Sequence, residues 1–332
     1  MNTDKSIFLH CVRWVCSLLV LIGHSHLIGG WGGAVFVFLA SHAHAAVMVF
    51  FVLSGYVIAS SVERKRELGI TLNSYYLDRF SRIYSVLIPA IILTVLLDAI
   101  GAQLFQQRYL DPAFLPQDHF AIRFFVNIFS LQGIWGYRVQ LGSNPALWSI
   151  GYEFCYYILY GLLIWRPPYW QLFILFLALV IGPKVLMYGL VWLLGVLAFK
   201  IQSKSKINFL FGLSGLLIAN HFLQYNPLIY MPEFLRDFIF GIVVMVFILA
   251  NPKLPSNKNL LRANLWMAEF SYSSYAYHYP IMFMAYSLFA PTEIFSWSLV
   301  LISLIVTRCF YEITEKKRYI FRNMIVKYST IF

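Results

Sequence analysis

Long apolar runs recur from one end of the chain to the other, separated by short polar segments. A helix of about 20 apolar residues is long enough to cross the hydrocarbon core of a bilayer. Applied along the chain, this criterion predicts an all-α, polytopic integral membrane protein with about ten transmembrane helices. The predicted spans are residues 8–28, 44–61, 83–104, 146–165, 169–181, 185–199, 207–223, 238–250, 265–288 and 295–313.

A breaker interrupts the longest apolar stretch. The sequence Gly182-Pro183-Lys184 lies in its middle. Proline lacks a backbone N–H donor, and the Gly-Pro pair favours a turn over a continuous helix. The pattern therefore predicts two short helices here instead of one long one.

The basic residues fall mostly on one side of the predicted spans. Lysines and arginines concentrate in cytoplasmic segments of membrane proteins, so this asymmetry predicts that both termini are cytoplasmic. The longest segment on the opposite side, residues 103–145, mixes aromatic residues, prolines, glycines and charges. We expect an ordered loop or interfacial helix there, positioned to cover or recognise a substrate.

Composition strengthens the membrane interpretation. Of the 332 residues, 60% are hydrophobic and 12% are charged, and the mean hydropathy is +0.71. The net charge of +11 is explained by membrane anchoring, so no nucleic-acid partner is expected. The four cysteines lie in apolar stretches without C-x-x-C spacing, which argues against a disulfide scaffold or a thiolate metal site.

Two ionisable residues share one face of the first predicted helix. Arg13 and His24 are eleven residues apart, and at about 100° per residue this spacing returns to nearly the same direction. Ionisable residues inside a span usually face a cavity or a partner, so the stripe suggests a path through the helix bundle. In the alternative interpretation, Arg13 extends to the inner headgroups and His24 lies at the outer interface.

Histidines cluster near the start of the chain and raise the question of a metal site. His24, His26, His42 and His44 form two His-x-His pairs. On a helix the two rings of such a pair point about 200° apart, so metal binding would require an extended loop. Residues 6–62 also contain no carboxylate. No metal site is therefore expected.

Two arginines precede the third predicted span. Arg79 and Arg82 are neighbours on a helix at i, i+3. Two adjacent guanidinium groups at the cytoplasmic face suit phosphate groups, such as those of a nucleotide-bearing donor. Ordinary anchoring at the inner headgroups is the alternative.

A carboxylate lies in the outer half of the fourth predicted span. Glu153 has Ser149 and Tyr157 at i−4 and i+4, so the three side chains share one helix face. A buried glutamate needs partners or it protonates. Glu153 can therefore orient a histidine, hold a sugar hydroxyl or pair with another helix, and the sequence leaves these roles open.

Residues 271–280 are rich in hydroxyl groups for a membrane helix, and Ser274 and Tyr275 lie beside His278. In the second span the small Ser54-Gly55 step allows close approach of another helix or a ligand, with helix packing as the default. Arg308 and Glu312, at i, i+4, are expected to form a structural ion pair.

In combination and in this order, these residues resemble the membrane-bound acyltransferase-3 family. The resemblance rests on Arg13 and His24, residues 50–58, Arg79 and Arg82, residues 147–149 with Glu153, Ser274 and Tyr275 with His278 and Pro280, and Glu312. It covers nearly the whole chain. It implies a single membrane domain over residues 1–332, ten core helices and, because the chain ends soon after its last span, no fused extracytoplasmic domain.

The resemblance also implies a reaction. It implies that a multi-pass protein of the bacterial inner membrane uses acyl-CoA from the cytoplasm. The acyl group is expected on a carbohydrate, such as O-antigen of lipopolysaccharide or exopolysaccharide. Acetyl-CoA is the expected co-substrate, no cofactor is permanently bound, and the partners are the glycan or lipid-linked glycan acceptor and membrane lipids. The alternative is a transporter or flippase of a polar lipid or sugar, although no inverted repeat is evident.

The acyltransferase hypothesis assigns a role to each candidate site residue. His24 is a general base or a transient acyl carrier, and the sequence does not choose between the two. The other candidate groups complete the site around it. They are Arg13 and Glu153 as further catalytic residues, Arg79 and Arg82 as acyl-CoA ligands, and Ser54, Tyr275 and His278 in the substrate pocket.

Overall fold

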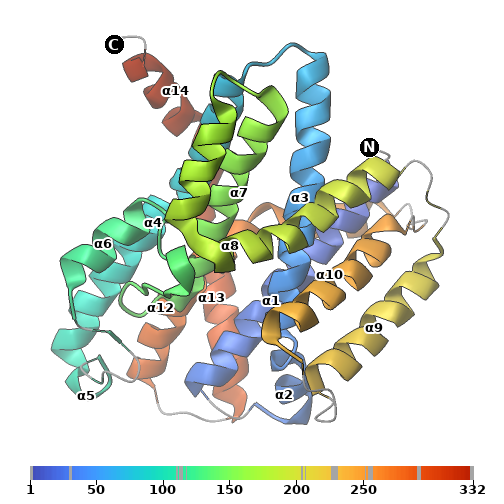
Figure 1. The fold of residues 1–332 in the computed structure, drawn as a ribbon. Helices are drawn as coiled ribbons and strands as arrows, with labels where there is room; N and C mark the ends of the chain where they lie inside the picture. Colours follow the sequence, from blue (N-terminus) through green and yellow to red (C-terminus); the bar gives the residue numbers. More distant parts are fainter. Residues whose placement is uncertain are drawn as a thin grey trace. The chain divides into compact units, whose positions relative to one another are not determined.

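The structure of the chain is a computed structural model that describes most of its residues (Figure 1). The residues outside the description are 1–2, 30–31, 110, 112–114, 117, 203–204, 206, 226–230, 251, 253–256, 290–292 and 330–332.

The regular elements of the described chain are helices, which confirms the all-α prediction. The α-helices are α1 (Thr3–Gly29), α2 (Ala34–Ala40), α3 (Ala43–Glu67), α4 (Leu72–Leu104), α5 (Gln106–Tyr109), α6 (Phe120–Ile128), α7 (Trp148–Trp165), α8 (Trp170–Ile201), α9 (Phe209–Tyr225), α10 (Glu233–Leu249), α11 (Lys258–Glu269), α12 (Ser271–Leu288), α13 (Glu293–Ile313) and α14 (Arg318–Ser329). Short 3₁₀ turns lie at Ile134–Gly136, Pro145–Leu147 and Glu315–Lys317.

Six helical stretches in the described residues are long and apolar enough to cross a membrane, which establishes a polytopic membrane protein. They are Asp4–Gly29, Ala34–Glu67, Leu72–Leu104, Pro145–Trp165, Trp170–Ile201 and Ser296–Met324. A shorter apolar helical stretch covers Phe209–Leu223.

The predicted break in the longest apolar stretch is confirmed inside α8. Gly182 has φ 80° and ψ 173°, a conformation that is essentially restricted to glycine. A Cβ atom at Gly182 would lie 2.9 Å from Cα of Trp135. Backbone geometry and close packing therefore both require glycine at the kink.

Two of the boundaries that differ from the prediction concern helices with predicted site residues. α4 begins at Leu72, because the Thr71 hydroxyl accepts a hydrogen bond from the Ser74 N–H and caps the helix. This early start places the two candidate phosphate-binding arginines within α4. The predicted span 265–288 is divided at Phe270, since Asn257 caps a separate helix, α11, that starts earlier.

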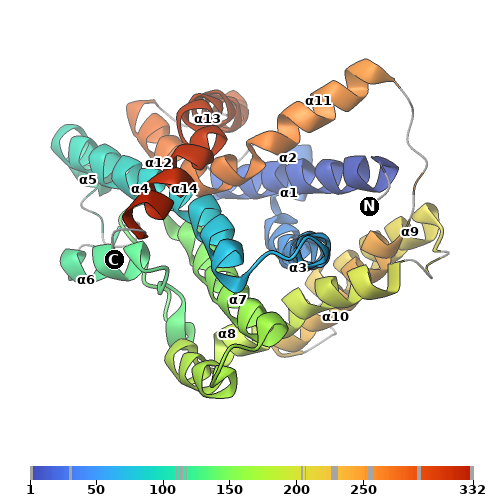
Figure 2. The same cartoon turned by 90° about the horizontal axis from the view of Figure 1, so that it is seen from above.

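The described chain divides into two compact units. Unit 1 comprises residues 1–20, 41–70 and 186–271, and unit 2 comprises residues 21–40, 71–185 and 272–332. Within unit 1, α10 packs against α3 and lies side by side with α9 (Figures 1 and 2). Within unit 2, α4 packs against α5, α6, α7 and α14 (Figure 1). The single domain expected from the sequence stays a prediction.

Unit 1 contains a close backbone crossing between α3 and the second half of α8. A Cβ atom at Gly195 would lie 2.7 Å from the Tyr56 backbone N and 2.8 Å from the Val52 carbonyl carbon. A Cβ atom at Gly55 would likewise be closer than 3.0 Å to the backbone carbonyl oxygen of Trp192. Glycines on both helices therefore let the two backbones touch.

A lysine near the N-terminus completes unit 1. The Lys5 side chain is 4% exposed, and its Nζ donates to the carbonyl oxygens of Ile248 and, at 2.8 Å, Ala250. These carbonyls lie at the C-terminal end of α10. Because helix ends leave carbonyls unpaired and carry partial negative charge, Lys5 caps α10.

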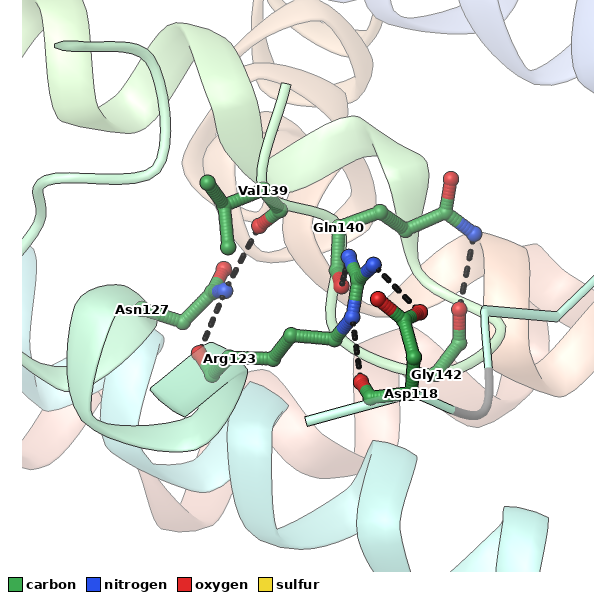
Figure 3. A network of polar contacts seen from close by, with 6 residues as sticks. All are labelled: Asp118, Arg123, Asn127, Val139, Gln140 and Gly142. Carbon is green, nitrogen blue, oxygen red and sulfur yellow. Dashed lines mark hydrogen bonds and ion pairs between the residues drawn. The ribbon is translucent and has the colours of Figure 1, made fainter. Parts of the chain in front are cut away.

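In unit 2 the segment between α5 and α7 is held by polar contacts, as Figure 3 shows. The Arg123 guanidinium donates to Asp118 Oδ1 at 2.7 Å and to the Gln140 carbonyl oxygen at 3.1 Å. Asn127 Nδ2 donates to the Val139 carbonyl oxygen at 2.8 Å. The hydrogen bond from Arg123 also holds the pKa of the Asp118 carboxyl below its usual value. Residues 118–147 therefore form an ordered, hydrogen-bonded loop that carries α6.

The end of the same loop is attached to two helices of unit 2. The buried Asn144 carboxamide donates to Thr94 Oγ1 of α4 at 3.2 Å and to the Ala276 carbonyl oxygen of α12 at 3.0 Å. The Ser143 N–H donates to Asp98 Oδ2 at 2.8 Å. These contacts fix where α7 begins.

Candidate active site

The structure brings two predicted site residues into direct contact. His24 Nδ1 of α1 lies 2.6 Å from His278 Nε2 of α12. The rings are nearly parallel, with an interplanar angle of 12°, and the ring of Tyr279 contacts His24 edge-on at 5.2 Å. His278 is fully buried. Both histidines belong to unit 2.

The hydrogen-bond partners assign the tautomers of this histidine pair. His278 Nδ1 lies 3.0 Å from the Ser274 carbonyl oxygen, and a carbonyl oxygen can only accept, so Nδ1 carries the proton. Nε2 of a neutral His278 is then an acceptor, and His24 Nδ1–H donates to it. His24 Nε2 is left with a free lone pair, which is the state required of a base or a nucleophile.

Hydroxyl groups continue from the histidine pair along α12 to α7. Tyr275 lies one turn before His278 and its hydroxyl is 2.7 Å from Ser149 Oγ. On the same face of α7, Tyr157 donates a hydrogen bond to Glu153 Oε1. The expected i, i+4 relationship between these residues is therefore present, and Glu153 has a hydroxyl partner.

Polar groups of α7 face the hydroxyl-rich segment of α12. Ser149 of α7 hydrogen-bonds to Tyr275 of α12, and Glu153, one turn later on α7, interacts electrostatically with both Tyr272 and Tyr275. The Glu153 carboxylate therefore lies near two tyrosines of α12.

Arg82 lies at the Tyr272 end of this array. Its guanidinium carbon is 5.5 Å from the centre of the Tyr272 ring, and Glu315 and Glu153 interact electrostatically with it. Glu315 also accepts a hydrogen bond from Ser273 Oγ at 2.7 Å. Arg82 thus lies beside an aromatic face and experiences the negative charge of two carboxylates.

Two further arginines, Arg79 and Arg318, add positive charge near Arg82. The Arg79 guanidinium lies 5.8 Å from the centre of the Tyr75 ring. Both Arg79 and Arg82 interact electrostatically with Arg318, at the start of α14. These three guanidinium groups outnumber the nearby carboxylate of Glu315, and this excess of positive charge favours binding of an anion such as a phosphate.

The histidine pair and the arginine group lie beside different turns of α12, near His278 and near Tyr272 respectively. Tyr272 and His278 are six residues apart, which corresponds to about 9 Å along the helix axis. An elongated substrate with an anionic end can therefore contact both groups at once.

Two predicted site residues belong to the other unit. Arg13 lies on α1 within unit 1 and is partly buried. Ser54 lies on α3 of unit 1, and its hydroxyl accepts a hydrogen bond from Trp192 Nε1 at 3.2 Å, next to the close helix crossing. This hydrogen bond is a contact between packed helices, and the place of Ser54 in a substrate pocket stays a prediction.

Sequence reasoning missed part of the site but assigned one ion pair correctly. Tyr272, Glu315 and Arg318 were not singled out, although Tyr272 is one helical turn from Tyr275 and helix periodicity identifies it. No local signal connects Glu315 or Arg318 with the rest. In α13, Arg308 donates to Glu312 at 2.6 Å, as expected, and Lys316 contacts the same carboxylate.

These features define a polytopic membrane protein whose helices enclose a histidine with a free ring nitrogen, near a group of arginines. Comparison with known proteins identifies the family. Residues 6–310 match the family described as an acyltransferase domain, and the chain belongs to this family. The resemblance drawn from the sequence motifs is thereby confirmed.

One curated relative is an O-acetyl transferase from Shigella phage Sf6. It is 27% identical over 165 residues, which cover 48% of this chain and 46% of the phage protein. The match thus spans about half the length of that relative. No solved structure matches the chain.

Proposed function

We propose that this protein transfers an acyl group, acetyl from acetyl-CoA, to a hydroxyl group of a cell-surface carbohydrate such as O-antigen or exopolysaccharide. The reaction takes place in the cell membrane, the inner membrane of a bacterium. The observation that carries the proposal is the histidine pair, which leaves His24 Nε2 free to accept a proton. Membership of an acyltransferase family and the partial match to an O-acetyl transferase support the same chemistry.

In the proposed reaction, His24 Nε2 removes the proton from the acceptor hydroxyl. The hydroxyl oxygen attacks the carbonyl carbon of the thioester, and the C–S bond breaks. CoA leaves as a thiolate, and the proton stays on His24 until it passes to that thiolate. In the alternative sequence, Nε2 itself attacks the thioester and displaces the CoA thiolate. The acceptor hydroxyl then attacks the acyl-imidazole, the acyl C–N bond breaks, and the hydroxyl proton passes to the thiolate. Both routes need the same nitrogen unprotonated and oriented.

His278 is proposed to act as the positioning residue for His24. Its Nδ1–H donates to the Ser274 carbonyl oxygen, so its Nε2 accepts a hydrogen bond from the Nδ1–H of His24. This interaction fixes both the tautomer and the ring orientation of His24. When His24 gains positive charge, the same hydrogen bond strengthens because its donor is then cationic.

The arginine group is proposed to bind the phosphates of acyl-CoA. Arg79 and Arg82 would contact the phosphates, and the pantetheine arm would extend along α12 toward the histidines. Arg13 is proposed to stabilise the developing oxyanion. Glu153 is proposed to orient the acceptor.

Acceptor contacts complete the proposed site. Tyr275 and Ser54 are proposed to line the acceptor pocket with His278. The Tyr275 hydroxyl, paired with Ser149 at 2.7 Å, is a group that can bind a sugar hydroxyl.

Ten membrane spans with cytoplasmic termini are proposed for the topology. The kinked α8 supplies two of them, and α9, α10 and α12 supply three further short ones. A single cysteine placed at Gly69 should be labelled from the cytoplasmic side, and one placed at His119 from the opposite side. Labelling of both from one side would contradict this topology.

The function is tested with membranes that contain equal amounts of folded protein and acetyl-CoA labelled on the acetyl group. Wild type should transfer label to the glycan fraction, and His24→Ala should lose at least about 100-fold in rate, the usual contribution of a general base. His26→Ala, a partly buried histidine on the same helix, is the matched control and should retain wild-type rate.

A second comparison tests the histidine pair. His278→Ala should lower the rate, and His278→Gln should restore part of it, because a glutamine oxygen can still accept the His24 N–H. Equal transfer by wild type and His24→Ala would refute the mechanism. Sugar or lipid flux without acetyl-CoA consumption would instead establish the transporter alternative.

A further inference from the structure

A second cluster of polar side chains lies in unit 1, away from the residues assigned to acyl transfer. One potential ligand atom from each of His44, Glu233 and Asp237 lies within 4.8 Å of the others. His44 Nε2 is 2.9 and 3.0 Å from the two carboxylate oxygens of Asp237. We propose that these three residues bind one divalent transition-metal ion of the Zn²⁺ type.

The arrangement of helices explains how the ligands meet. Glu233 and Asp237 are four residues apart at the start of α10, so both carboxylates lie on one helix face. His44 is the second residue of α3, and α3 packs against α10. The two helix starts therefore supply a nitrogen and two carboxylates to one point.

The donor set selects the class of ion. Imidazole nitrogen suits Zn²⁺ and other late first-row metals, whereas Mg²⁺ and Ca²⁺ favour sites made of oxygen. Three protein ligands leave a further coordination position for water or another ligand. One histidine and two carboxylates therefore match a Zn²⁺ site better than a site for a hard cation.

The surroundings of Asp237 support the same assignment. Asp237 is fully buried, whereas the His44 side chain is 37% exposed, which gives an ion a path from solvent. The Tyr188 hydroxyl donates to Asp237 Oδ2 at 2.8 Å, as outer partners of metal-binding carboxylates commonly do. A divalent cation would supply positive charge next to this buried carboxylate.

Binding requires one proton to move. Without the ion, the contact between His44 Nε2 and Asp237 is a hydrogen bond with Nε2–H as donor. An ion between them needs the Nε2 lone pair, so the neutral ring gives its Nε2 proton to water and takes up a proton from water at Nδ1, with no net release. Asp237 keeps its hydrogen bond from Tyr188.

Glu233→Gln tests the proposal without disturbing the remaining network. The Glu233 side chain is exposed, so this change removes a charged ligand while the contacts of His44, Tyr188 and Asp237 stay intact. The full-length protein in detergent is treated with EDTA, freed of it and titrated with ZnCl₂ by calorimetry. Absorption of the Co²⁺-loaded protein then reports the coordination geometry.

We expect saturable binding of one Zn²⁺ per chain. Glu233→Gln and His44→Gln should each weaken it at least about tenfold, whereas His42→Gln and the exposed Glu269→Gln should bind as wild type does. Absence of saturable binding would overturn the proposal. Equal affinity of wild type and Glu233→Gln would overturn it as well, and would leave His44, Tyr188 and Asp237 as a hydrogen-bonded network.

Discussion

The crossing of α3 and α8 leads to a sharp prediction about stability. A Cβ atom at Gly195 would lie 2.7 Å from the Tyr56 backbone N, whereas ordinary Cβ contacts begin at 3.4 Å. In Gly195→Ala the Tyr56 backbone must therefore retreat by about 0.7 Å, and the Val52 carbonyl oxygen, which would be closer still, must retreat further. Overpacking typically costs about 1–3 kcal/mol of stability. Because rigid backbone lies on both sides of this contact, we expect a loss of about 3 kcal/mol in the free energy of unfolding. The gain in helix propensity offsets about 0.5–1 kcal/mol of that.

The measurement is thermal unfolding in detergent, followed with a dye that reacts with the buried Cys16 and Cys155 as they become exposed. Gly215→Ala is the matched control, because its nearest atom would be 3.9 Å away, and it should be neutral or stabilising. Gly55→Ala combined with Gly195→Ala should cost less than the sum, since one separation of the helices relieves both clashes. Wild-type stability of Gly195→Ala, or full additivity of the pair, would refute the reasoning.

Three further changes test other parts of the structure. Gly182→Ala should destabilise the protein by about 1–3 kcal/mol, because its backbone conformation is restricted to glycine; an unchanged melting temperature would contradict this. Asn144→Ala should cost about 1–3 kcal/mol in the same assay, because it leaves buried partners unsatisfied, whereas the exposed Asn73→Ala should have little effect. Because Arg123 lowers the pKa of Asp118, their bond is complete above the usual value of 3.8 and is lost as pH falls through the folded pKa. A spin label in this loop should therefore gain mobility in acid, and Asp118→Asn should show that mobility at pH 7.

Much of the fold could be predicted because lipid imposes a strong requirement on the sequence. A spanning segment must be apolar and helical, so its position is visible as a hydrophobic run. The break at Gly182 was also visible, since Gly-Pro acts locally. The early start of α4 was missed because residues 72–82 are too polar for a span, and a span-length criterion does not detect a helix that extends beyond the apolar region.

The candidate site was only partly predictable for a different reason. His24 and His278 were both singled out, but their contact joins residues 254 positions apart, and no local pattern encodes such pairing. The same limitation applies to His44, because residues 6–62 around it contain no carboxylate. Glu233 and Asp237 reach it through the packing of α10 on α3, which is a property of the tertiary structure.

The cap that Lys5 forms on α10 has a consequence for how the protein is made. Lys5 is among the first residues to be synthesised, and its partner Ala250 follows 245 positions later. At typical translation rates this separation corresponds to a delay of about 12–50 s. During that time the start of α1 must remain in the membrane without its final partner. Assembly of unit 1 is therefore completed late, when the last third of the chain is emerging from the ribosome.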